Sequence, residues 1–177
     1  QHQIVKKTIE YIPGLFKLFD ECIINCRDHV VRMNSHISAG KPNCLPVTCI
    51  SVDIADDGTI TMMNDGAGID VAMHPTYGVW IPELIFGHLR SSTNYDDKEK
   101  NDIAALKQKM AEEGKFYGLW GGKNGLGIKL VFIWSMFGSV ETVDHVRGLK
   151  YYQEFRSNLS EIGDPVVTKC TSSGGGN

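Results

Sequence analysis

Two groups of residues in this sequence could do chemistry, and the first is the run from Gly121 to Lys129, with four glycines in seven residues. Glycine can take positive φ and approach a ligand closely, so its amides can cradle a polyanion. Lys123 and Lys129 add positive charge, and the apolar residues 130–134 predict a buried helix whose N-terminus favours phosphate. The run is therefore either a phosphate cradle or a glycine-rich turn.

The spacing of these glycines excludes two common phosphate loops. A P-loop needs lysine directly after its second glycine, but Ile128 follows Gly127 and Lys129 comes one residue late. The dinucleotide fingerprint G-x-G-x-x-G also fails, because the glycines here fall at 122, 125 and 127. A phosphate site at this run would belong to another fold.

The second group is Glu21 and Asn25, four residues apart in a segment, 15–34, whose apolar residues recur at helical spacing. One turn apart on a helix, they could offer a carboxylate base beside a neutral oxygen ligand. The same arc of the helix also carries Lys17, Asp28 and Arg32. A solvated polar face is the alternative interpretation of this arc.

Composition limits the class of protein. The chain has 177 residues, 42% of them hydrophobic and 22% charged, as in an ordinary globular domain. A net charge of −3 does not indicate nucleic-acid binding, and no apolar run is long enough to span a bilayer. Five cysteines without a Cys-x-x-Cys pair indicate reduced thiols in an intracellular protein.

The remaining segments predict the elements that position these groups. Residues 47–54 and 59–64 form a hairpin whose Ile50, Val52 and Ile54 would face the 15–34 helix. A short helix begins near Pro82, and residues 139–144 and 149–155 form a second hairpin. Residues 96–115 are either an amphipathic lid or a surface excursion. The order predicts an α/β (α+β) two-layer sandwich, with helices on one face of a mixed, mostly antiparallel sheet.

Four separated pieces of the sequence resemble one family in the correct order. They are the residues 19–25, 64–69, 81–97 and 121–129. Together they are similar to the ATPase domain of type IIA DNA topoisomerases, in the superfamily of gyrases, chaperones, histidine kinases and mismatch-repair proteins with the Bergerat ATP-binding fold. The Asn-Tyr-Asp-Asp ending at 94–97 resembles the eukaryotic and large-DNA-virus branch. The resemblance favours the phosphate cradle over the turn at Gly121–Lys129.

The resemblance implies a role for each matched residue. Glu21 matches the general base that activates water, and Asn25 matches the ligand that holds Mg²⁺ against the triphosphate of ATP. Asp65 matches the residue that recognises adenine, with Gly66 and Gly68 making room for it. A phosphate and ribose contact of the family is matched by Ser92, Thr93 and Asn94. The family's glycine-rich phosphate lid is matched by Lys123, Asn124, Gly125, Gly127 and Lys129.

The resemblance also sets the expected organisation. Residues 1–170 would be the ATP-binding domain, as a fragment of a longer protein, and residues 171–177 a flexible tail. In the whole enzyme the domain would close as a homodimeric gate around DNA, in the nucleus or at a viral replication site. A lysine that completes the γ-phosphate site and a threonine that contacts adenine are not identifiable here.

Two departures from the family keep alternatives open. His29 stands where the family usually has Asn, which leaves either a lost contact or a partly exposed helix histidine. The stretch from Lys98 to Trp120 is longer than the family's connector. A non-catalytic nucleotide-binding or dimerisation module of the same fold is the second hypothesis, and a chaperone- or mismatch-repair-type ATPase is the third.

Overall fold

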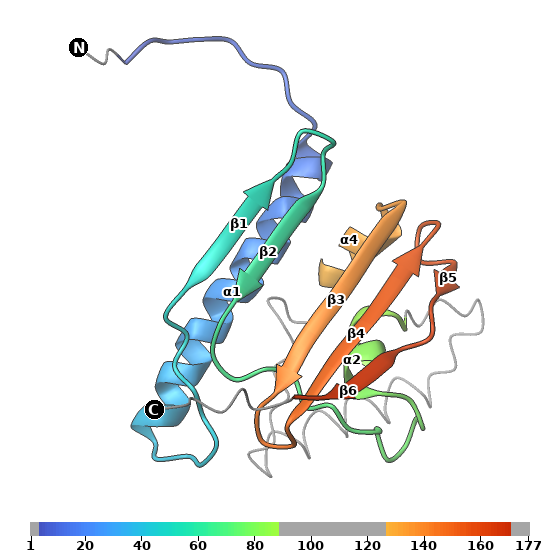
Figure 1. Ribbon diagram of the computed structural model, residues 1–177. Helices are drawn as coiled ribbons and strands as arrows, with labels where there is room; N and C mark the ends of the chain where they lie inside the picture. The colour runs from blue at the N-terminus through green and yellow to red at the C-terminus, as the bar shows by residue number, and fades with distance from the viewer. Residues whose placement is uncertain (1–3, 89–126, 171–177) are drawn as a thin grey trace, which may run out of the picture.

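The computed structural model describes residues 4–88 and 127–170. Within them, the long helix α1 (Pro13–Ser38) lies along a hairpin of β1 (Ile50–Ile54) and β2 (Ile60–Asn64). A second sheet follows, made of β3 (Phe137–Asp144), β4 (Leu149–Arg156), β5 (Glu161–Ile162) and β6 (Val166–Lys169). The two short helices are α2 (Ile81–Phe86) and α4 (Gly127–Ile133), and Figure 1 shows them on one side of this second sheet.

The two-layer arrangement of helices on antiparallel strands is confirmed, with one difference in the sheet. The strands of the described residues form a two-stranded and a four-stranded sheet in place of one continuous layer. Every strand pairing within these two sheets is antiparallel. In β3 and β4 the buried residues alternate, with Val140 paired to Gln153 and Thr142 paired to Tyr151. This alternation places one face of the sheet against the helices.

The core lies where α4 and α2 pack on β3 and β4. Phe132 of α4 meets Phe155 of β4 edge-on with 5.0 Å between ring centroids, and Phe86 of α2 lies 5.8 Å from Phe132. Val140 completes the cluster from β3. Edge-to-face aromatic pairs of this kind add to the stabilisation from burial. The core therefore fixes α4, and with it Gly127, relative to the second sheet.

The hairpin covers α1 mainly through β2, whereas the prediction named residues of β1. Ile50, Val52 and Ile54 were expected to cover the helix, but all three are exposed, and Ile54 retains 62% of its accessible surface. β2 contacts α1, and its Met62 and Asn64, which pair with Val52 and Ile50 on the same face of the hairpin, are half-buried. Strand alternation identifies which residues share a face, but not how much of that face the helix covers.

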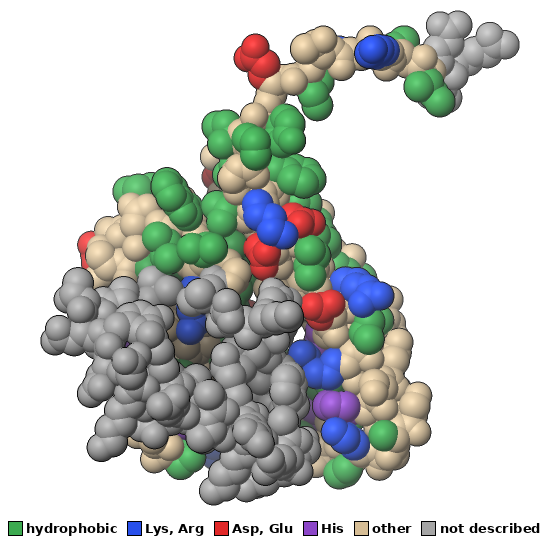
Figure 2. Space-filling view, turned by 180° about the vertical axis from the view of Figure 1, so that it is seen from behind, with side chains coloured by type: hydrophobic (Ala, Val, Ile, Leu, Met, Phe, Trp, Pro, Cys, Tyr) green, Lys and Arg blue, Asp and Glu red, His purple; other side chains and the backbone are tan. Residues whose placement is uncertain are grey.

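The start of α1 carries apolar side chains that the rest of the described chain leaves exposed. Ile12, Leu15 and Phe16 each retain more than 60% of their accessible surface, and Tyr11 packs edge-on against Phe16. Figure 2 shows these side chains gathered where the N-terminal segment meets the helix. All five cysteines are free thiols, as predicted. No helix among the described residues is long and apolar enough to cross a membrane.

Candidate functional site

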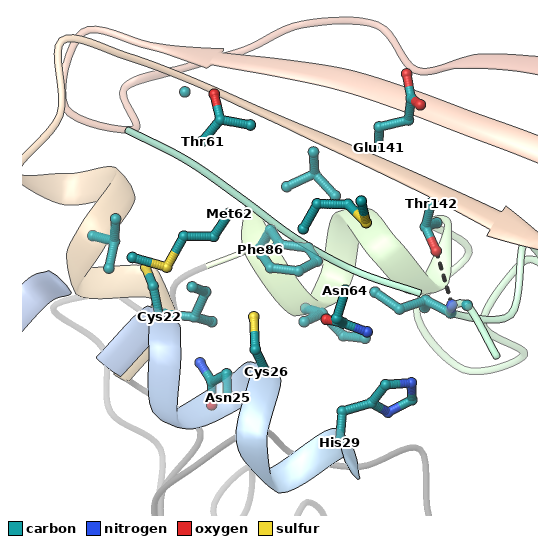
Figure 3. A pocket seen from close by; sticks show the side chains of 18 of the residues that line it. Cys22, Asn25, Cys26, His29, Thr61, Met62, Asn64, Phe86, Glu141 and Thr142 are labelled. Atoms are coloured by element: carbon teal, nitrogen blue, oxygen red, sulfur yellow. Dashed lines mark hydrogen bonds between the residues drawn. The ribbon is translucent and has the colours of Figure 1, made fainter. Parts of the chain in front are cut away.

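A pocket opens beside α1, lined by that helix together with β2, α2 and β3 (Figure 3). Asn25, Cys26 and His29 of α1 line it on one side, while Asn64 of β2 lies across from them. These three helix residues are buried, with 4%, 8% and 5% of their surface exposed. A helix side that buries an amide and an imidazole beside a thiol is not a simple packing surface, because buried polar groups need partners.

Glu21 lies one turn before Asn25, at the point where α1 meets α4. Glu21 Oε1 forms an ion pair with Lys17 Nζ at 3.0 Å, and 17% of the Glu21 side-chain surface is exposed. Its Oε2 lies against Gly127, where an added Cβ would collide with the carboxylate. The structure thus brings together the predicted base and one glycine of the predicted cradle.

Asn25 is the most unusual polar residue of the site. Neither its Nδ2 nor its Oδ1 has a hydrogen-bond partner among the described residues, although both atoms are buried. Leaving a buried amide unpaired costs about 1–3 kcal/mol. The prediction of a solvated face is therefore wrong for Asn25, and the unpaired amide is available to a ligand.

His29 lies one turn beyond Asn25 and is buried, so the interpretation as a partly exposed histidine is wrong. Its Nδ1 accepts a hydrogen bond from Arg32 Nη2 at 2.5 Å, which requires the imidazole nitrogen to carry no proton. Burial lowers the pKa of His29, as do the charges of Arg32 and His36, while a hydrogen bond with the Ala67 backbone acts in the opposite direction. The histidine therefore stays neutral between α1 and the turn after β2.

Asp65 does not present a free carboxylate to the pocket. Its Oδ1 accepts the backbone N–H groups of Thr48 and Cys49 at 2.7 and 2.8 Å, and its Oδ2 accepts the Thr48 hydroxyl at 2.5 Å. These bonds lower the pKa of Asp65, led by the one from the Thr48 hydroxyl. These three donors occupy three of the roughly four lone-pair sites of a carboxylate. The main observed contacts of Asp65 are therefore with the start of the hairpin.

The neighbouring residue, Asn64, points the other way. Successive side chains of a strand alternate between its two faces, so Asn64 shares the pocket side of β2 with Met62 (Figure 3). Its Nδ2 donates to the Asp65 carbonyl at 2.9 Å, which fixes the orientation of the amide. Its Oδ1 is the acceptor that this arrangement turns toward the pocket.

The two glycines after Asp65 are required by the chain's own packing. Gly66 has φ of +96°, and a Cβ there would lie 2.8 Å from Val47 Cγ2. Gly68 lies so close to β3 that a Cβ would collide with the Val143 carbonyl. Their predicted role of making room for adenine stays a prediction.

Comparison with known proteins agrees with this geometry. No family model matches the chain. It is 37% identical over 172 residues to DNA topoisomerase 2 of Acanthamoeba polyphaga mimivirus and 35% identical over 171 residues to that of Arabidopsis thaliana, covering 97% of this chain in each case. The crystal structure of the ATPase and transducer domains of DNA topoisomerase II from Balamuthia mandrillaris matches 92% of this chain and 34% of its own, with 38% identity and a TM-score of 0.65.

The ATPase region of Saccharomyces cerevisiae topoisomerase II matches 93% of this chain and 36% of its own, with 36% identity and a TM-score of 0.67. The chain belongs with the ATPase regions of type II DNA topoisomerases. It spans about a tenth of the length of the curated topoisomerases it matches, 11% of the mimivirus protein and 10% of the Arabidopsis protein.

Several predicted contacts of this ATPase region lie outside the described residues. They are Ser92, Thr93, Asn94, Lys123, Asn124 and Gly125, together with the Lys98–Trp120 stretch. Gly127 and Lys129 are described, and both belong to α4. Of the predicted site residues, the structure therefore places Glu21, Asn25 and Gly127 together and leaves the serine cluster and most of the glycine run as predictions.

Two residues of the pocket were not singled out from the sequence. Asn64 could have been found from the alternation of β2, because Met62 and Asn64 share one face while Asp65 falls on the other. Arg32 was placed in a solvated arc, yet it lines the pocket beside His29. Its partial burial could not be predicted from the helix period alone, because that period also fits an exposed polar face.

Proposed function

We propose that this chain binds ATP with Mg²⁺ and hydrolyses it, as part of the ATP-driven gate of a type IIA DNA topoisomerase. The observation that carries the proposal is the pair Glu21 and Asn25. One turn apart on α1, they place a carboxylate against Gly127 and an unpaired buried amide in the pocket wall. The names of the homologues support the same assignment.

Asn25 fits a role in holding Mg²⁺ beside the nucleotide. Among the described residues no group of three or more His, Cys, Asp or Glu side chains could hold a metal by itself. Magnesium at nucleotide sites is commonly bound through one or two protein oxygens, with phosphate and water as the other ligands. The orphaned Oδ1 of Asn25 is an oxygen of this kind. When bound, the ion would neutralise charge that develops on the phosphates.

Glu21 would act as the general base. Phosphoryl transfer depends mainly on positioning and on stabilisation of charge, and a fixed carboxylate can orient the attacking water and take its proton. The contact with Gly127 on one oxygen and the ion pair with Lys17 on the other fix the Glu21 side chain.

For adenine recognition, we infer that Asn64 is better placed than Asp65. The Asn64 amide lies on the pocket side of β2, whereas the Asp65 carboxylate already accepts three hydrogen bonds. Asn64 Oδ1 could accept from the exocyclic amine of adenine while its Nδ2 remains on the Asp65 carbonyl. Asp65 would then support recognition by fixing the end of β2.

The remaining contacts of the proposal are those implied by the family. Ser92, Thr93 and Asn94 would bind phosphate and ribose, and Lys123, Asn124, Gly125, Gly127 and Lys129 would close over the triphosphate. Dimerisation, passage of DNA through the gate and a site of action in the nucleus or at viral replication sites belong to the complete protein.

Isothermal titration with a non-hydrolysable ATP analogue tests the proposal, with and without Mg²⁺. We expect saturable binding that strengthens when Mg²⁺ is added, because Asn25 Oδ1 would coordinate the ion beside the phosphates. Absence of binding at millimolar analogue would overturn the proposal. Turnover by the complete protein that survives Glu21→Gln unchanged would overturn the assignment of the base alone.

A further inference from the structure

The segment from Gly66 to Val71 leaves the pocket and runs onto the second sheet, where two side chains of β3 hold its backbone. The Ile69 N–H donates to Thr142 Oγ1 at 2.9 Å, and the Val71 N–H donates to Asp144 Oδ2 at 2.9 Å. Thr142 and Asp144 are two residues apart in β3, so they lie on the same face of the strand. Their spacing in β3 matches the spacing of Ile69 and Val71, whose backbone N–H groups donate to them.

These anchors are buried, which makes them effective. Thr142 retains 9% of its surface, Asp144 2% and Val71 1%. Burial acts to raise the pKa of Asp144, but the backbone and guanidinium of Arg147 together with the Val71 N–H lower it, so the carboxylate stays charged. Hydrogen bonds to a charged acceptor are among the stronger ones in proteins.

Arg147, which is partly exposed, links the segment to β3 through two ion pairs. Its Nη1 lies 2.7 Å from Asp144 Oδ2 and 3.3 Å from Asp70 Oδ1, so one guanidinium joins β3 to the segment that it holds. Gly68 rests directly on the Val143 carbonyl, which leaves no room between segment and strand. The position of the segment is therefore set by β3, a strand of the packed core.

The segment matters because its other end carries the pocket residues. Asn64 and Asp65 precede Gly66 directly, and Ala67 meets His29 through its backbone. We propose that Thr142 and Asp144 are positioning residues that hold the purine end of the nucleotide pocket by anchoring the backbone of Ile69 and Val71. The inference rests on the proposed function, since it assigns to these residues a role in nucleotide binding that acts through the backbone of the segment.

The test compares two variants of Thr142 in the complete protein. Thr142→Val keeps the shape and removes the acceptor, while Thr142→Ser keeps the acceptor and removes the methyl group. We expect Thr142→Val to raise the KM for ATP by about 3- to 10-fold with little change in kcat, the range expected for loss of one hydrogen bond. Thr142→Ser should stay close to the unmodified protein.

Two further measurements separate positioning from packing. Hydrogen exchange of the Ile69 amide should accelerate in Thr142→Val and not in Thr142→Ser. Affinity for inorganic tripolyphosphate, which lacks adenine, should be equal in both variants. If Thr142→Val leaves the KM for ATP unchanged while Thr142→Ser raises it, Thr142 acts through packing and the inference is overturned.

The design also distinguishes this inference from the proposed function. If the unmodified protein binds no ATP analogue, the proposed function and the inference both fail. If it binds and Thr142→Val leaves KM unchanged, the inference alone fails. Should Thr142→Val not fold, Arg147→Gln replaces it, because Arg147 is partly exposed. We expect Arg147→Gln to raise the KM for ATP by about 2-fold, because it removes a weaker, screened ion pair. An unchanged KM would again overturn the inference.

Discussion

The carboxylate of Glu21 lies directly against the backbone of Gly127, although the two residues are more than a hundred positions apart in the sequence. Any side chain at position 127 would occupy the space of Glu21 Oε2. A carboxylate that must orient one water molecule is sensitive to displacements of about 1 Å. The relationship therefore makes Gly127 a determinant of where the proposed base points.

Gly127→Ala should lower kcat for ATP hydrolysis by at least about tenfold in the complete protein, because the added methyl group displaces the Glu21 carboxylate. Steady-state kinetics measures this effect. Gly14→Ala is a matched control on α1, since a Cβ at Gly14 meets nothing within 4 Å. Equal turnover in the two variants would show that contact with Gly127 does not set the position of Glu21.

Asn25→Leu should stabilise the nucleotide-free protein and abolish its response to nucleotide. Leucine has a similar volume and removes two buried unpaired polar atoms, which cost about 1–3 kcal/mol. For a domain of this size, each kcal/mol corresponds to about 2–4 °C in melting temperature. Thermal unfolding, with and without Mg²⁺ and ATP analogue, measures both effects.

The control for Asn25→Leu is Asn34→Leu, at an exposed position of the same helix. Asn34→Leu should leave both the melting temperature and the stabilisation by nucleotide nearly unchanged. If Asn25→Leu instead lowers the melting temperature of the nucleotide-free protein, the Asn25 amide has a partner, and its availability to a ligand is refuted.

Periodicity was enough to predict α1 and the two hairpins, because long amphipathic patterns specify element type directly. It could not predict that Ile54 is exposed while Met62, on the same face of the hairpin, is half-buried, because alternation does not say how far the helix extends over that face. The extent of that cover depends on partners far away in the sequence. β5 and β6 were also missed, because segments of two and four residues carry no detectable period.

The candidate site shows the same limit at single residues. The motif at 64–69 located the right end of β2 from the sequence, but choosing between Asn64 and Asp65 required knowing which neighbour Thr48 would bind. Likewise, the spacing of Glu21 and Asn25 predicted a shared helix face, while the burial of Asn25 depends on the surrounding elements. Local patterns specify candidates, and tertiary contacts select among them.

Asn64→Ala should weaken binding of an ATP analogue by about 3- to 10-fold, the range expected for one lost hydrogen bond to adenine. Asp65→Asn should have a smaller effect, because its Oδ1 can still accept from Thr48 and Cys49 while its Nδ2 donates to the Thr48 hydroxyl. Titration calorimetry on both variants makes the comparison. A larger loss in Asp65→Asn would assign adenine recognition to the carboxylate.

Stability should fall as pH drops below about 6.5, and His29 should account for part of this loss. The pKa of His29 is lowered in the folded protein, so the unfolded chain binds its proton first as pH falls through the ordinary histidine range. Wherever the unfolded state binds more protons, stability rises with pH, by at most about 1.4 kcal/mol per pH unit for one group. His36 and His74 have lowered pKa values too and add to the slope.

His29→Asn isolates the contribution of His29, since asparagine cannot titrate. Urea unfolding between pH 7.5 and 5 should give a shallower loss of stability for His29→Asn than for the unmodified protein. The carboxylates of Asp65 and Asp144 do not confuse this window, because their pKa values are lowered from 3.8 and their contributions are lost only at more acidic pH. Parallel curves for the two proteins would mean that His29 is protonated equally in the folded and unfolded states, contrary to its burial against Arg32.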